Sequence, residues 1–186
     1  MRPAAFLFIA ASAVTLSAQS LTIDVAGDAL RVKAPGFGIV QGPTLQRLKD
    51  GRSVRVELEL TVLAGPSGRQ LAQTRQVFGL SFDIWDERFV VTRTGTPPRS
   101  TSLSRATDTD AWCIANIAVP IASFGRRDRT APFWIKLGYR VQNPAATADV
   151  DAEPGFTLKG LIDKLSRKTP DNELGASMEA GPFRLN

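Results

Sequence analysis

Three carboxylates fall close together in the segment FDIWDERFVV, residues 82–91. They are Asp83, Asp86 and Glu87, and Trp85 stands among them. Carboxylates that converge on one point can hydrolyse a glycosidic bond or supply the oxygen ligands that calcium prefers. The same residues can instead form a connector between two strands, because aspartate bonds its own backbone in turns. The sequence leaves both interpretations open.

Several common kinds of catalysis are excluded by residue types that the chain lacks. It has no histidine and a single cysteine, Cys113. A Ser-His-Asp or Cys-His site is therefore impossible, and no recognisable zinc set is present. Cys113 stands between Trp112 and Ile114, and its predicted role is that of a small buried apolar side chain. We expect a protein that is not an enzyme and that has no cofactor and no metal site.

The first twenty residues, MRPAAFLFIAASAVTLSAQS, predict export. One charge at Arg2 is followed by an apolar run and then by small residues, which is the order of a secretory signal. The run is shorter than the roughly 20 residues that span a bilayer. We therefore predict a signal peptide over residues 1–20, one domain over residues 21–186, no transmembrane span after cleavage, and a periplasmic or secreted protein.

The predicted mature chain carries a modest excess of positive charge. The sequence has 23 Lys and Arg residues against 18 Asp and Glu residues, and cleavage of the signal removes one basic residue, Arg2. Such an excess favours anionic surfaces, including envelope lipids and acidic glycans. The basic residues are scattered rather than gathered in a motif, so nucleic acid is not a predicted partner.

Two segments alternate strictly between apolar and polar side chains, and they must position any site. Residues 53–63 read SVRVELELTVL, and residues 133–141 read FWIKLGYRV. A period of two places all the apolar side chains on one face, which a helix does not do. A strand with one polar face is typical of antiparallel sheets. Each segment is therefore predicted to be a strand that lines the core.

Weaker patterns predict the other strands. A hairpin is expected over residues 21–33, and a strand returns over residues 69–85 after a Gly-Pro turn. A β-rich run follows the acidic segment over residues 88–92, and residues 94–100 are predicted to form a loop. Residues 181–185 predict a short edge strand.

Three short helices are predicted around these strands. The first covers residues 44–49, with its initial threonine as the cap. The second lies within residues 108–117, with Asp108 or Thr109 as its cap. The third is amphipathic and covers residues 156–168. With the strands, they predict a mainly β fold, an antiparallel β-sandwich with two or three short peripheral helices.

A candidate binding surface follows from the polar parity of residues 133–141. If Phe133 faces the core, then Trp134, Lys136 and Arg140 face outward. An exposed tryptophan flanked by basic residues is typical of contact surfaces for proteins or glycans. The alternative is that the predicted helix over residues 156–168 packs over this face and buries it.

Four stretches together carry a resemblance: SFDIWDERFVVT, AWCIANIAVPI, FWIKLGYRV and LIDKLSR. They resemble an uncharacterised family of exported bacterial domains of unknown function. The resemblance covers most of the mature chain and rests on the order and spacing of aromatic residues. It implies a bacterial, envelope-facing, β-rich protein, and it supplies no functional residues.

These observations predict a non-enzymatic exported module that binds an envelope protein or glycan through an exposed sheet face or edge. The prediction rests on the signal, the missing catalytic sets and the outward parity of Trp134, Lys136 and Arg140. The alternative is a calcium- or carboxylate-dependent carbohydrate-active domain that uses the end formed by Asp83, Asp86 and Glu87.

Overall fold

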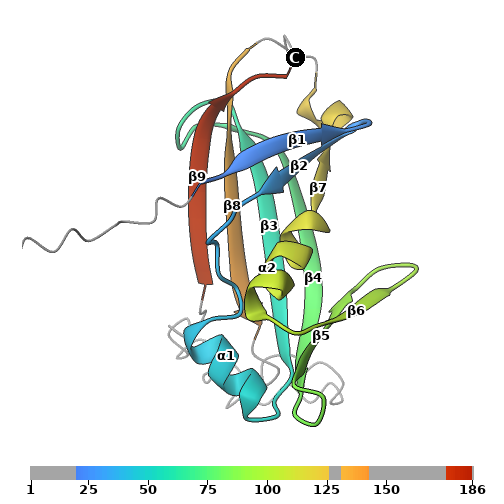
Figure 1. The fold of residues 1–186 in the computed structure, drawn as a ribbon. Coiled ribbons are helices and arrows are strands. Elements are labelled where there is room, and N and C mark those ends of the chain that lie inside the picture. Colours follow the sequence, from blue (N-terminus) through green and yellow to red (C-terminus); the bar gives the residue numbers. More distant parts are fainter. Residues whose placement is uncertain (1–19, 126–130, 143–174, 186) are drawn as a thin grey trace, which may run out of the picture.

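The fold is shown by a computed structural model that describes residues 20–125, 131–142 and 175–185 (Figure 1). Apart from Ser20, the predicted signal lies outside these ranges, and so does the predicted helix over residues 156–168. Within the described ranges, none of the helices has the length and apolar character needed to cross a membrane.

Six antiparallel strands form the larger sheet, in the order β6-β5-β4-β3-β8-β9. The strands are β3 (Val54–Leu63), β4 (Gln70–Asp83), β5 (Arg88–Arg93), β6 (Arg99–Leu103), β8 (Phe133–Gln142) and β9 (Gly175–Phe183). The strand with the clearest alternation, β3, pairs with β4 on one side and β8 on the other. The two segments that alternate most strictly are therefore neighbours in the middle of the sheet.

Three antiparallel strands form the smaller sheet, in the order β1-β2-β7. They are β1 (Thr22–Ala26), β2 (Ala29–Lys33) and β7 (Ala118–Pro120). Figure 1 shows this sheet lying across one face of the larger sheet. The protein is thus mainly β, with two antiparallel sheets in a sandwich-like arrangement, as the sequence predicts.

Two helices and one 3₁₀ turn complete the described elements. They are α1 (Gly42–Lys49), α2 (Ala106–Ala115) and η1 (Ile121–Phe124). Helix α2 contacts β2, β5 and β6, so it extends the layer that the smaller sheet begins (Figure 1). Helix α1 contacts β3 and β4. Both helices confirm sequence predictions.

The predicted caps of these helices are wrong. The capping positions are Gln41 and Arg105, and neither side chain caps its helix by a hydrogen bond. Thr109 lies inside α2, where its hydroxyl donates to the carbonyl oxygen of Arg105 at 3.0 Å. Because this bond occupies the hydroxyl within the helix, Thr109 serves the helix interior rather than its start. Asp108 lies in the first turn, where its charge still favours the helix dipole.

The core fills the space between the larger sheet and the layer of β1, β2, β7 and α2. On β3, the five alternating apolar side chains from Val54 to Val62 are at most 4% exposed. Leu30 of β2 and Val119 of β7 belong to the same core cluster and are also fully buried. The period-two pattern therefore sorts side chains as predicted, with the polar set on the outer face of the larger sheet.

Two strand boundaries differ from the predictions. Strand β6 begins at Arg99, inside the segment predicted as a loop. Its sequence RSTSL is mostly polar because both of its faces are largely exposed at the sheet edge. Strand β9 starts at Gly175 and is longer than the predicted edge strand over residues 181–185.

Replacement of Leu60 by alanine is expected to lower the free energy of unfolding by about 2–5 kcal/mol, because the side chain is fully buried and leaves a cavity. Urea denaturation followed by tryptophan fluorescence measures this change. The matched control is Val25→Ala, because Val25 is 47% exposed and its loss should cost less than about 0.5 kcal/mol. Equal losses at the two positions would show that β3 does not line the core.

Candidate functional site

The acidic segment forms the turn between β4 and β5. Asp83 is the last residue of β4, and its Oδ1 accepts hydrogen bonds from the amides of Trp85 at 2.9 Å and Asp86 at 3.2 Å. Glu87 has a left-handed backbone conformation, with φ of 51°. This is the connector geometry in which an aspartate side chain closes a turn on its own backbone. The carboxylate of Asp83 is therefore used by the turn.

A calcium site at this end would need further carboxylates beside Asp83. Across the described ranges, no group of three or more acidic, cysteine or histidine side chains is placed to hold a metal ion. Asp110, an acid that could join the set, is bound instead to the amides of Ile39 and Val40. The geometry therefore adds no support to the calcium-dependent alternative.

The tip of the same turn is apolar and projects into solvent. Trp85 is 90% exposed and Ile84 is 57% exposed. Apolar side chains alternate along this part of the chain up to Phe82. The strand predicted over residues 69–85 ends two residues earlier, at Asp83, so Ile84 lies in the turn. The alternation therefore stops where the turn begins.

Cys113 takes the structural role that its neighbours predict. Its side chain is 1% exposed and belongs to the core cluster. Burial, with a smaller effect from the nearby charge of Asp110, raises the pKa of the thiol to about 12. The thiolate that redox or nucleophilic chemistry requires does not form near neutral pH.

The predicted binding residues lie on the outer face of the larger sheet, on β8. Lys136 and Arg140 are exposed there, while Trp134 is half-buried. A Cβ atom added to Gly181 of β9 would lie 2.6 Å from Cδ1 of Trp134, so the indole ring packs directly on this glycine. The structure thus places Trp134 against the edge strand, with the two basic residues further along β8.

A polar groove of about 300 Å³ runs along this part of the outer face. Its middle is Gly138, which stands between Lys136 and Arg140 on β8 and pairs with Glu59 and Ser177 on the neighbouring strands. Because Gly138 has no side chain, the surface is hollow at this point. The charged residues around it come from two neighbouring strands: Glu57, Glu59, Lys136 and Arg140.

The two glutamates of the groove are held in place by their neighbours. Nε of Arg75 lies 2.9 Å from Oε2 of Glu59 and 3.6 Å from Oε1 of Glu57. Nε2 of Gln142 donates to Oε2 of Glu57 at 2.9 Å. Exposed ion pairs of this kind contribute about 1 kcal/mol or less to stability, so their main effect is to orient the carboxylates.

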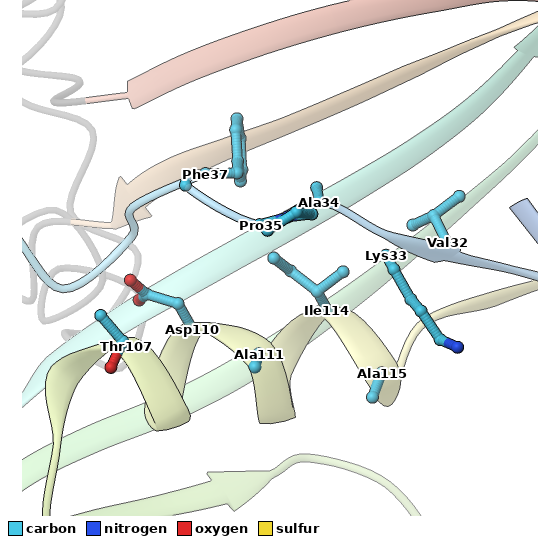
Figure 2. Close-up of a pocket in the computed structure, with 11 residues that line it drawn as sticks. Val32, Lys33, Ala34, Pro35, Phe37, Thr107, Asp110, Ala111, Ile114 and Ala115 are labelled. Carbon is cyan, nitrogen blue, oxygen red and sulfur yellow. The ribbon is translucent and has the colours of Figure 1, made fainter. Parts of the chain in front are cut away.

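A second concave site lies on the opposite side of the larger sheet, between α2 and residues 32–37 (Figure 2). We call it the α2 trough, and its volume is about 480 Å³. Several of its lining residues are small, including Ala34, Gly36, Ala111 and Ala115. Small side chains on both walls leave open space that larger residues would fill.

Asp110 is the acidic residue of the α2 trough, and it is 9% exposed. Its Oδ1 accepts hydrogen bonds from the amides of Ile39 at 3.1 Å and Val40 at 2.8 Å. Burial raises the pKa of this carboxyl group from 3.8 to about 6, and the two amide bonds oppose that rise. The side chain therefore ties α2 to the segment that leads into α1.

Sequence reasoning named Lys136 and Arg140 of the polar groove but missed its two glutamates, and it missed the α2 trough entirely. The polar parity of residues 53–63 already placed Glu57 and Glu59 on one face, and pairing of that strand with residues 133–141 would have brought them beside Lys136 and Arg140. Asp110 gave a weaker signal, as an acid in a mostly apolar helix. Its partners at residues 39–40 are some 70 positions away in sequence, which no local pattern reveals.

No protein-family model, no curated protein and no solved structure matches the chain. The resemblance to exported bacterial domains stays a prediction.

Replacement of Asp83 by alanine is expected to lower the free energy of unfolding by about 1 kcal/mol, because the turn loses two amide hydrogen bonds at an exposed site. Asp83→Asn should retain most of the stability, since the amide oxygen accepts the same bonds. Chemical denaturation of both variants makes the comparison. Equal losses for alanine and asparagine would contradict the role of the turn bonds.

Replacement of Asp110 by asparagine is expected to change how stability depends on pH. Between pH values of about 4 and 6 the folded protein keeps a proton that the unfolded chain releases, since the folded pKa is about 6 and the ordinary value is 3.8. The stability from this group is thus fully present below pH 4 and is lost as pH rises through 6. As pH rises from 4 to 7, the free energy of unfolding of the wild type should therefore fall by about 2 kcal/mol relative to that of Asp110→Asn.

Unfolding midpoints in urea across this pH range measure the difference between the two proteins. Asp110→Ala is the control, because it removes the acceptor of both amides and should be about 1–3 kcal/mol less stable than Asp110→Asn at every pH. A constant difference between wild type and Asp110→Asn would contradict the raised pKa.

Proposed function

We propose that the chain is a non-enzymatic exported protein that binds an envelope glycan through the polar groove on the outer face of its larger sheet. One observation carries the proposal: Glu57, Glu59, Lys136 and Arg140 stand around the hollow at Gly138, all on paired strands. Strands hold side chains more precisely than loops do. The sequence of residues 1–20 supports export to the periplasm or beyond.

The chemistry of the groove suits a sugar polymer. Hydroxyl groups both donate and accept hydrogen bonds. The carboxylates of Glu57 and Glu59 accept from them, while Lys136 and Arg140 donate to them. The excess of basic over acidic residues, 22 against 18 once Arg2 is removed with the predicted signal, favours a glycan that itself carries acidic groups.

A protein partner fits this face less well. Protein interfaces are built around an apolar centre with aromatic anchors. The tryptophan of this face, Trp134, packs against Gly181 instead of standing free, and half of the residues around Gly138 are charged. An envelope protein that adds a strand at the edge of β9 is the competing interpretation, and it would not depend on the groove.

Two changes at the groove are expected to weaken glycan binding by tenfold or more. The first is the double substitution Lys136→Ala and Arg140→Ala, which removes two charge-assisted donors. The second is Gly138→Val, which fills the hollow with a residue that strands accept. Binding to a panel of immobilised acidic and neutral bacterial envelope glycans measures both, with melting temperature as the check on folding.

The matched control removes the same charge elsewhere, through Lys49→Ala and Arg52→Ala, both exposed at the end of α1. Full binding by this control, with loss in the groove variants, supports the groove. Equal weakening by both pairs would reduce the effect to overall charge. If the groove variants bind the glycans as tightly as the wild type does, and an envelope protein still binds to them, the proposal is wrong. Binding of that protein at the edge of β9 then replaces it.

A further inference from the structure

We propose that the α2 trough is a second binding site, separate from the outer groove, and that it takes a small apolar amine whose protonated nitrogen pairs with Asp110. The two sites lie on opposite sides of the larger sheet and share no lining residue. The inference therefore does not depend on glycan binding.

The shape of the α2 trough fits a small molecule. Its volume of about 480 Å³ lies within the range of roughly 300–1,000 Å³ that is usual for ligand pockets. On the helix side, Ala111 and Ala115 are one turn apart and present little more than methyl groups. Facing them, Ala34 and Gly36 are equally small. The space is therefore open because the side chains on both walls are small and the fold holds the walls apart.

The walls are firmly supported. One wall follows directly from β2, which is paired on both sides in the smaller sheet. At its far end, the ring of Phe37 packs edge-on against Tyr139 of β8, with ring centroids 5.7 Å apart and planes at 86°. On the other wall, Ile114 of α2 is 3% exposed and belongs to the core. A site built on such elements exists before a ligand arrives, which limits the entropic cost of binding.

The polar group at one end of the α2 trough is the carboxylate of Asp110 (Figure 2). Both of its hydrogen bonds to the described residues go to Oδ1. Among the described residues, Nε of Arg93 is fully buried and lacks a hydrogen-bond partner. Oδ2 of Asp110 also has no hydrogen-bond partner among these residues, but it is not fully buried. It is therefore accessible at the end of the apolar α2 trough.

The charges around Asp110 decide which ligand head group fits. The titratable groups that face it are Cys113 on the same helix and Tyr139 on β8, and burial raises the pKa of both, so both are neutral near pH 7. Lys33 lines the other end of the α2 trough, and Figure 2 shows its amine directed away from Asp110.

At neutral pH the carboxylate is ionised, largely buried and hydrogen-bonded at one oxygen. A ligand ammonium at Oδ2 would supply the missing positive charge through a charge-assisted hydrogen bond. A carboxylate head group would instead place like charges together, and a neutral hydroxyl would provide a weaker bond. The chemistry therefore favours an amine over an acid or an alcohol of the same shape.

The test uses three probes of matched shape: phenylpropylamine, phenylpropanol and phenylpropanoate. Calorimetric titration of the full chain at pH 7.5 should rank the amine first, at least about tenfold tighter than the alcohol. The advantage of the amine should shrink about tenfold at pH 5, where Asp110 is largely protonated. Amide shifts in NMR spectra should place all bound probes at Ala111 and Ala115.

Variants assign the effect to the α2 trough. Ala111→Phe fills the space and should abolish binding of the amine and the alcohol alike, with Ala115→Phe as a second filling variant if the first fails to fold. Asp110→Asn should reduce the affinity for the amine to that for the alcohol. Lys136→Ala with Arg140→Ala, at the outer groove, should leave amine binding unchanged, and this separates the two proposals.

Any of the following results would overturn the inference: no binding by any probe up to millimolar concentration, phenylpropanoate binding as tightly as the amine, unchanged amine binding in Asp110→Asn, or unchanged binding in both filling variants. Equal affinity for amine and alcohol at every pH would likewise show an apolar cavity in which Asp110 plays no part.

Discussion

The whole structure depends on covering the inner face of the six-stranded sheet. That face presents a continuous apolar surface from β3, β4 and β8, and it is removed from water almost completely. The smaller sheet has three strands and covers part of it, and α2 covers a further part beside β2 (Figure 1). Burial of apolar surface at about 25 cal/mol per Å² makes this cover the main stabilising term. With one cysteine in the chain, no intramolecular disulfide adds to it.

The smaller sheet and α2 meet at a junction, and buried polar groups lie there within the otherwise apolar inner layer. The chain leaves β2, passes along α2 and turns into α1, and its amides at Ile39 and Val40 need acceptors because both residues are buried. Asp110 supplies the acceptor from α2. The same junction leaves the α2 trough, since a helix and an extended segment with small side chains do not fill the space between them. The outer face of the larger sheet carries no such demand and is free to hold the charged groove.

The sequence predicts the parts of the fold that depend on local periodicity. The strands β3 and β8 follow from strict alternation, and Cys113 follows from its apolar neighbours. Strand β6 was missed because RSTSL has one large apolar residue, so pairing with β5 defines it rather than burial. The predicted cap of α2 was wrong because the hydroxyl of Thr109 donates a hydrogen bond inside the helix. The glutamates of the polar groove and the whole α2 trough were missed for a related reason: strand pairing or layer packing brings these residues to their neighbours, as with Asp110 and Val40.

The central claim is that the carboxyl group of Asp110 is buried at the junction between α2 and the segment after β2, with one oxygen bound to the chain. The most direct measurement is the pKa of this carboxyl group, from the pH dependence of its ¹³Cγ chemical shift in the labelled protein. A midpoint near pH 6 agrees with the raised pKa that burial causes. A midpoint near pH 4, the ordinary value for an exposed aspartate, would show that Asp110 lies in water and would contradict the account.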